Sequence, residues 1–167
     1  MISRDVLNAL AQNGRLIRHH PNLDRDAVER RRIYVVPDLH RRLVDRDMAA
    51  VRSHLKQFVV GAPLSGTDFI ARLKPDPAGI WEFRIQLVPE HRVFGAFAQK
   101  DCFVACLLRD RAALKARKGE DRNAKFAAAI RDVQTEWSAP FGTLRPLQNL
   151  EFNEFMTPKF EINDHAE

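Results

Sequence analysis

Polar side chains alternate with apolar ones in the stretch 81–85 and recur where the next run begins. Glu82 and Arg84 share the polar face of this pattern, and His91 and Arg92 open the following run. Cutting RNA by attack of a 2′-hydroxyl requires a base, cations around the phosphate and an acid for the leaving oxygen. Arginine suits the second task because its guanidinium binds phosphate oxygens in a bidentate way and keeps its proton. Glu82 and His91 are the candidate bases.

The same side chains have simpler interpretations. Glu82 and Arg84 could form an exposed cross-strand ion pair, which contributes only ~0–1 kcal/mol. His91 stands beside a turn, where a histidine is commonly just solvated. The arginine triplet 30–32 could contact phosphates, but a charge run of this kind is more often a solvated surface. Residue types alone leave both interpretations open.

Five runs have the composition of β-strands. The first, 32–36, is β-branched and aromatic and stops at Pro37, as a strand would. Among the later runs, 81–87 alternates most regularly, and the last is almost wholly apolar, as expected at the centre of a sheet. The five runs are 32–36, 69–74, 81–87, 91–97 and 102–108.

Helical periodicity appears between and beside these runs. The stretch 38–59 carries apolar residues at helical spacing in two pieces and predicts a helical hairpin, and 123–137 predicts a closing helix. A weaker pattern over 3–18 begins with Ser3 as a possible cap. The fold class predicted is α+β, with an antiparallel β-meander of about four strands packed by the two-helix hairpin and the C-terminal helix.

The pattern also predicts how the chain is organised. We expect an N-terminal helical extension over 1–31, a main domain over 32–137 and an irregular C-terminal tail over 138–167. Trp81 and Trp137 are expected in the core, with base stacking as the alternative.

Composition bounds the class of protein. The 167 residues are 45% hydrophobic and 29% charged, with a net charge of +5, which is compatible with a nucleic-acid partner. No apolar run approaches the ~20 residues of a membrane-spanning helix, and the amino terminus lacks the pattern of a secretory signal, so we expect a cytoplasmic protein without a membrane partner. Cys102 and Cys106 would lie ~13 Å apart along one strand, too far for a disulfide, so buried free thiols are expected rather than a zinc site.

The order of elements and three short motifs resemble the RelE/ParE superfamily of toxins, particularly its HigB-like members. The motifs are a Leu-Lys element at 73–74, a Gly-aromatic-Glu-aromatic-Arg pattern over 79–85 and an Arg-Val-Phe strand at 92–94. The resemblance implies a toxin of a type II toxin–antitoxin system that cleaves mRNA on the ribosome without a metal or other cofactor and is held inactive by a cognate antitoxin protein. The alternatives are a non-catalytic member that binds a protein, as gyrase inhibitors do, and a phage or mobile-element accessory protein.

The resemblance also implies roles for individual residues. Arg84 falls where the family places a phosphate-contacting basic residue, Arg92 matches the arginine of the family's Tyr-Arg-Val strand, and Arg109 or Arg111 lies near its late basic position. The chain departs from the family pattern at two positions. The late catalytic tyrosine of some family members has no counterpart, because the single tyrosine of this chain is Tyr34 in the first predicted strand, and Gln86 replaces the second of two strand lysines. The expected catalytic group is Arg84, Arg92, His91, Glu82 and Arg109, and the expected RNA contacts are Lys74, Gln86 and Arg111.

Overall fold

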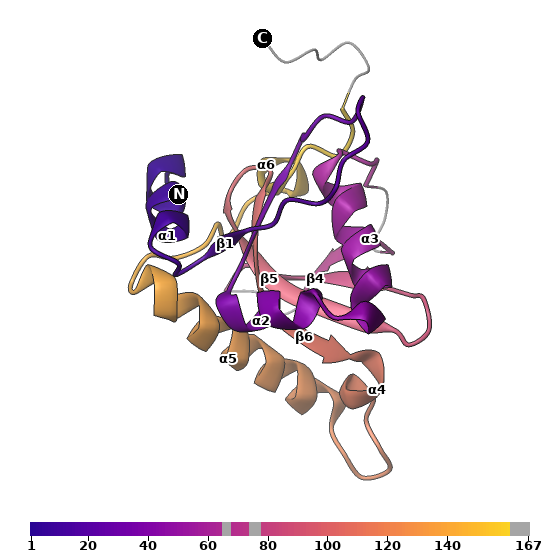
Figure 1. Ribbon diagram of the computed structural model, residues 1–167. Coiled ribbons are helices and arrows are strands. Elements are labelled where there is room, and N and C mark those ends of the chain that lie inside the picture. The colour runs from indigo at the N-terminus through magenta and orange to yellow at the C-terminus, as the bar shows by residue number, and fades with distance from the viewer. Residues whose placement is uncertain (65–67, 74–77, 161–167) are drawn as a thin grey trace.

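The computed structural model describes residues 1–64, 68–73 and 78–160. Its centre is a single six-stranded sheet with the strand order β1-β2-β6-β5-β4-β3, and helices flank it (Figure 1). The strands are β1 (Ile17–Arg18), β2 (Arg32–Val35), β3 (Ile70–Arg72), β4 (Ile80–Ile85), β5 (His91–Gln99) and β6 (Cys102–Asp110).

Helical segments lie before, between and after the strands along the chain. The N-terminal helix α1 is capped by the Ser3 side chain, which accepts a hydrogen bond from the Val6 backbone N–H, as its sequence predicted. The longest helix, α5, crosses one face of the sheet (Figure 1). The helical segments are α1 (Arg4–Gln12), α2 (Pro37–Leu43), the 3₁₀ turn η1 (Arg46–Met48), α3 (Ala49–Val59), α4 (Arg111–Leu114), α5 (Arg122–Phe141) and α6 (Phe152–Phe155).

The predicted four-stranded antiparallel meander is wrong, because the sheet is mixed and has six strands. The antiparallel succession β3-β4-β5-β6 is present, but β6 has a second neighbour, β2, which runs parallel to it from Arg32 opposite Cys102 to Val35 opposite Ala105. The physical reason lies in β2, where Ile33, Tyr34 and Val35 are all buried, so that the strand needs cover on both faces and a partner on both edges. The two-residue strand β1 fills its other edge.

The predicted two-helix hairpin is also wrong. The chain between β2 and β3 is the first part of the connection from β2 to its parallel partner β6, and it breaks into α2, η1 and α3. Arg42 fixes the break by donating to the carboxylates of Asp45 at 2.9 Å and Asp47 at 2.8 Å. As a result, α2 packs against β6, while α3 packs against β2 and β4.

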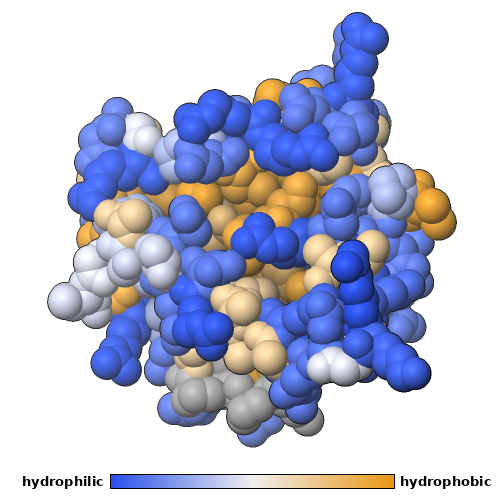
Figure 2. Space-filling view, turned by 90° about the horizontal axis from the view of Figure 1, so that it is seen from below, coloured by the Kyte–Doolittle hydropathy of each residue, from blue (hydrophilic) through white to orange (hydrophobic). Residues whose placement is uncertain are grey.

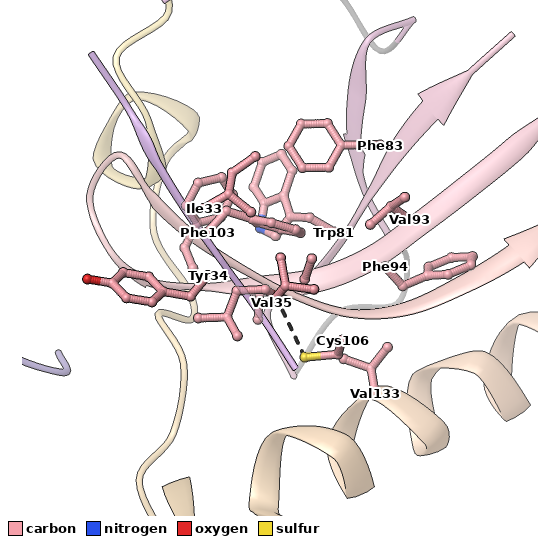
Figure 3. Close-up of a cluster of buried hydrophobic side chains, with 14 of the residues drawn as sticks. Ile33, Tyr34, Val35, Trp81, Phe83, Val93, Phe94, Phe103, Cys106 and Val133 are labelled. Carbon is pink, nitrogen blue, oxygen red and sulfur yellow. Dashed lines mark hydrogen bonds between the residues drawn. The ribbon is translucent and has the colours of Figure 1, made fainter. Parts of the chain in front are cut away.

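The core lies on both faces of the sheet, as the side chains in Figure 3 show. On the α3 face, the Phe58 ring contacts the edge of Phe83, and Phe83 contacts Phe103, with ring centroids 5.0 and 4.8 Å apart. On the α5 face, Cys106 lies beside Val133 (Figure 3). The two faces of the sheet are the α3 face and the α5 face, after the helix that covers each.

Several burial predictions are confirmed. Trp81 and Trp137 are buried, and Cys102 and Cys106 are buried free thiols. The core also draws on residues from both ends of the chain, including Leu7 of α1 and Phe155 of α6. Segments expected to lie outside the main domain thus contribute to the same core.

The arginine triplet 30–32 departs from the surface expectation at its central residue. The Arg31 side chain is fully buried and donates hydrogen bonds to the carbonyl oxygens of Phe58 at 2.9 Å and Thr157 at 2.7 Å. It also lies 3.7 Å from the carboxylate of Asp101. Arg31 therefore ties the end of α3 and the C-terminal segment to the sheet.

Candidate nucleic-acid interface

Three arginines form a row across neighbouring strands. The sheet register places Arg84 of β4 opposite Arg92 of β5, and Arg92 opposite Arg109 of β6. Directly opposed residues of antiparallel strands point to the same face, and adjacent strands are ~4.8 Å apart, so the three Cα atoms span ~10 Å. This face is the α5 face, because Arg109 pairs with Asp132 of α5 at 3.0 Å.

Glu82 joins this row from within the same strand as Arg84. Its carboxylate lies 2.8 Å from the Nε of Arg84 and 3.9 Å from the Nε of Arg92. The Glu82 residue is only 2% exposed, and its Oε2 atom accepts no hydrogen bond from any described residue. Glu82, Arg84 and Arg92 therefore form one compact ion cluster, as their sequence spacing suggested, but the carboxylate is enclosed.

Arg92 is the most confined arginine of the row. Its Nη1 donates to the carbonyl oxygen of His91 at 2.9 Å, and its Nη2 lies 3.6 Å from Glu90. Burial lowers the pKa of Arg92 from its usual value, with Glu82 acting in the opposite direction and Arg111 in the same one. The guanidinium remains protonated at neutral pH, because arginine titrates far above that range.

His91 does not share the site with Arg92. Successive residues of a strand point to opposite faces, so the imidazole of His91 faces away from the arginine row. It is 3% exposed, and its Nε2 lies 3.3 Å from Asp110 Oδ1. The predicted catalytic group of five residues is thus split between the two faces of the sheet.

The predicted RNA contacts are also dispersed. Gln86 is exposed beyond the end of β4, where its amide donates to the Asp68 carbonyl at 3.4 Å, and Lys74 lies outside the described residues. Arg111 opens α4 directly after β6, and its backbone N–H donates to the Glu90 carbonyl at 2.8 Å. Arg111 lies near the arginine row, where its charge acts on Arg92.

The strongest concentration of positive charge was not predicted. Residues 109–125 contain seven lysines and arginines against three acidic residues, which nearly matches the net charge of +5 of the whole chain. The composition of this segment contains the signal for a basic surface, but the sequence prediction took from it only that the segment is not a β-strand. We call the basic end the set Arg109, Arg111, Lys115, Arg117, Lys118 and Arg122, which lies at the end of β6, on α4 and on the loop leading into α5.

Local structure explains why the basic end is exposed. Glu120 accepts a hydrogen bond from the Arg117 backbone N–H at 2.8 Å and pairs with Lys125 at 2.7 Å, so that the loop closes on itself. The side chains of Lys115, Arg117 and Lys118 are exposed, and within the described chain none of them lies within ion-pairing distance of a carboxylate. The loop projects from the lower end of the molecule in Figure 1.

The arrangement suits binding of phosphate groups better than acid–base chemistry. A general base must come within hydrogen-bond reach of the proton that it removes, and Glu82 is enclosed by protein. Lys115, Arg117 and Lys118 of the basic end, by contrast, are exposed and open to a polyanion.

No protein-family model, no curated protein and no solved structure matches the chain. Over the ranges that the structure describes, no helix combines the length and the apolar character needed to cross a membrane, and no three or more histidine, cysteine, aspartate or glutamate side chains gather as a metal site would require.

Proposed function

We propose that this protein is a toxin of the RelE/HigB kind that acts on mRNA, and that RNA binds at the basic end. The observation that carries the proposal is the group of exposed cations Lys115, Arg117 and Lys118, which follow the end of β6 and α4 and have no carboxylate partner within the described chain. The proposal includes a cognate antitoxin as protein partner, the ribosome as the place where mRNA is met, and the cytoplasm as the compartment.

Electrostatics supports RNA binding at the basic end. A cation that has no carboxylate partner keeps its full charge for a ligand, and each phosphate that it neutralises releases a counterion. Lys115, Arg117 and Lys118 meet this condition within the described chain. Their loop also lies next to Arg111, so one RNA strand could contact the loop and the end of the sheet together.

The test of RNA binding compares two charge-reversed variants. Fluorescence anisotropy with a labelled 20-nucleotide single-stranded RNA would be measured for the wild type, for Arg117→Glu/Lys118→Glu and for the control Arg25→Glu/Lys100→Glu, whose altered residues are also exposed. The first variant should lose most of its affinity and the control should keep it. Equal losses in the two variants would reduce the result to overall charge and overturn the proposed location.

Salt dependence gives a second readout of the same site. For single strands, the slope of log K against log salt is about −0.7 for each phosphate neutralised. Replacing two phosphate contacts should make the slope shallower by about 1.4. An unchanged slope in Arg117→Glu/Lys118→Glu would mean that these side chains do not contact phosphates.

Cleavage of the bound RNA is the catalytic part of the proposal. The feature that favours it is the Glu82 carboxylate held between Arg84 and Arg92, which is the combination of a base and cations that attack by a 2′-hydroxyl requires. For Glu82 to act, the Arg84 side chain, which is partly exposed, must move to admit the ribose. Glu82→Gln keeps the shape of the side chain and removes the base.

Induced expression followed by primer extension on cellular transcripts tests cleavage. We expect growth arrest with new mRNA ends, both of which Glu82→Gln and Arg92→Ala should abolish in folded protein. The second candidate function, a non-catalytic relative that binds a protein or nucleic-acid target, is favoured by the enclosure of Glu82. Growth arrest without new mRNA ends would support it and would defeat the ribonuclease proposal.

A further inference from the structure

An apolar groove lies between α2 and α5, with β6 as its floor. One part of it has a volume of about 430 Å³, and a second part of about 230 Å³ adjoins it, since both are lined by Asp38 and Glu136. Figure 2 shows an apolar hollow bordered by hydrophilic side chains on the underside of the molecule. The groove reaches Arg109 and Ala113, but no residue of the exposed loop 115–121 lines it.

Aliphatic side chains make up the floor of the groove. Leu39 comes from α2, Leu107 and Leu108 come from β6, and Ala113 comes from α4. Leu107 and Leu108 are only half buried, although the rest of β6 from Cys102 to Cys106 is buried. No aromatic side chain lines the groove in the described chain, so a nucleobase would find no ring on which to stack.

Some charged side chains on the rim of the groove have ion-pair partners, and others have none in the described chain. Arg42 is neutralised by Asp45 and Asp47, and Arg109 is neutralised by Asp132. Arg15, in the wall of the second part, donates to the Ala139 carbonyl oxygen and has no carboxylate partner in the described chain. Glu136, which is half buried in the wall of both parts, has no ion pair or hydrogen bond to any other described residue through its side chain.

Among the remaining rim carboxylates, Asp110 adds to the negative charge of Glu136, because it faces His91, which carries charge only when protonated. Asp38 pairs with the exposed Arg41. In the first part of the groove, the charge left for a ligand comes from Glu136 and Asp110 and is therefore negative, which disfavours a phosphate backbone and favours a cationic group.

We propose that the groove docks a short amphipathic segment of a partner protein, whose aliphatic side chains fill the floor and whose lysine or arginine pairs with Glu136. Binding of an amphipathic segment in an apolar groove is a recurrent mode of peptide recognition, and a carboxylate at the rim selects its orientation. The proposal does not depend on RNA binding at the loop 115–121, because no residue of that loop lines the groove.

The experiment begins with the full chain and a displayed library of 16-residue segments. Peptides that are enriched would be synthesised with a fluorophore, and their affinity would be measured by anisotropy. Two variants alter the groove: Ala113→Arg places a bulky cation in it from an exposed position, and Glu136→Lys reverses the rim charge. The matched controls are Ala112→Arg, on the same short helix, and Thr135→Lys, next to Glu136 on α5; both control positions are exposed and do not line the groove.

We expect enriched peptides to carry aliphatic residues flanked by lysine or arginine. Their affinity should fall at least tenfold in Ala113→Arg and Glu136→Lys and stay within twofold in the two controls. The proposal is overturned if no peptide is enriched, if the flanking residues are acidic, or if Ala113→Arg binds like the wild type. Circular dichroism and urea unfolding of every variant would show that the fold is retained.

An RNA arm separates this proposal from the proposed function. The labelled 20-nucleotide RNA should bind Ala113→Arg at least as well as the wild type, because the variant adds a positive charge. If the RNA displaced the peptide from the wild type and Ala113→Arg lost RNA affinity, the groove would belong to the RNA site instead. Failure of Arg117→Glu/Lys118→Glu to weaken RNA binding would count against the proposed function and leave the groove untouched.

Discussion

Replacing Arg31 by methionine should destabilise the protein more than any other single arginine substitution that leaves the basic end intact. The guanidinium of Arg31 donates to the carbonyl oxygens of Phe58, Ala62 and Thr157 at 2.7–3.2 Å and faces Asp101 at 3.7 Å. Burial lowers the pKa of Arg31 to about 10, so that the side chain is still a cation at neutral pH. The guanidinium also lies over the rings of Phe58 and Phe160, 5.0 and 4.9 Å from their centroids.

The magnitude follows from what methionine leaves behind. Removing one partner of a buried ion pair costs about 3–5 kcal/mol, and a buried acceptor without a donor costs about 1–3 kcal/mol. Asp101 is partly compensated, since it keeps hydrogen bonds from the backbone and hydroxyl of Thr157 at 2.7 Å. We therefore expect the free energy of unfolding to fall by about 3–5 kcal/mol, out of the ~5–15 kcal/mol typical of a domain.

Urea unfolding followed by tryptophan fluorescence measures this loss. With an m-value of ~2 kcal/mol/M, the midpoint should move down by about 2 M at unchanged slope. Arg32→Met is the matched control, because Arg32 is the next residue of the same segment and is only half buried. The reasoning is refuted if Arg31→Met unfolds within 1 kcal/mol of the wild type, or if the control loses as much.

Three further predictions concern the rest of the fold. Burial lowers the pKa of His19 from 6.5 to about 4, with His40, His20 and Arg52 acting in the same direction. Between these two pH values the unfolded chain binds a proton at His19 and the folded chain does not, so the free energy of unfolding should fall as the pH drops from about 6.5 towards 4. His19→Gln should make the urea midpoint less sensitive to pH in that window, and an unchanged sensitivity would contradict this. A Cβ at Gly95 would lie 2.0 Å from the Val104 carbonyl oxygen, where the register between β5 and β6 shifts, so Gly95→Ala should lower the free energy of unfolding in urea by about 3 kcal/mol. Gly14→Ala, in open space, should lower it by only about 1 kcal/mol because of its positive φ, and similar losses in the two variants would contradict the close contact. Burial raises the pKa of Cys102 to about 12 and also raises that of Cys106, so both thiols should react with a disulfide reagent only in denaturant, and rapid reaction of native protein would show that one of them is accessible.

Local pattern was sufficient for much of the secondary structure. Alternation along 81–85 depends only on which residues avoid water, and it identified the strand β4 and the burial of Trp81. The same reasoning identified β2, because a β-branched run that stops before proline is strand-like in any context. The cap at Ser3 is likewise a local hydrogen bond.

The pairing of strands and the burial of polar side chains were decided by tertiary structure. The parallel contact of β2 with β6 joins residues about 70 positions apart, and no local period encodes a partner at that distance. Arg31 lies in a run of three arginines that pattern alone assigns to the surface, but the carbonyls that hold it come from α3 and from the C-terminal segment.

The candidate site shows the same division. The spacing of Glu82 and Arg84 placed them on one face, and the strand register brought Arg92 and Arg109 into line with them. The sequence by itself determined that basic side chains are concentrated near the end of the last strand. Only the tertiary structure decided that His91 faces away from Arg92, that Glu82 is enclosed, and that the loop 115–121 presents its cations to solvent, because each of these depends on which segments pack over the side chain.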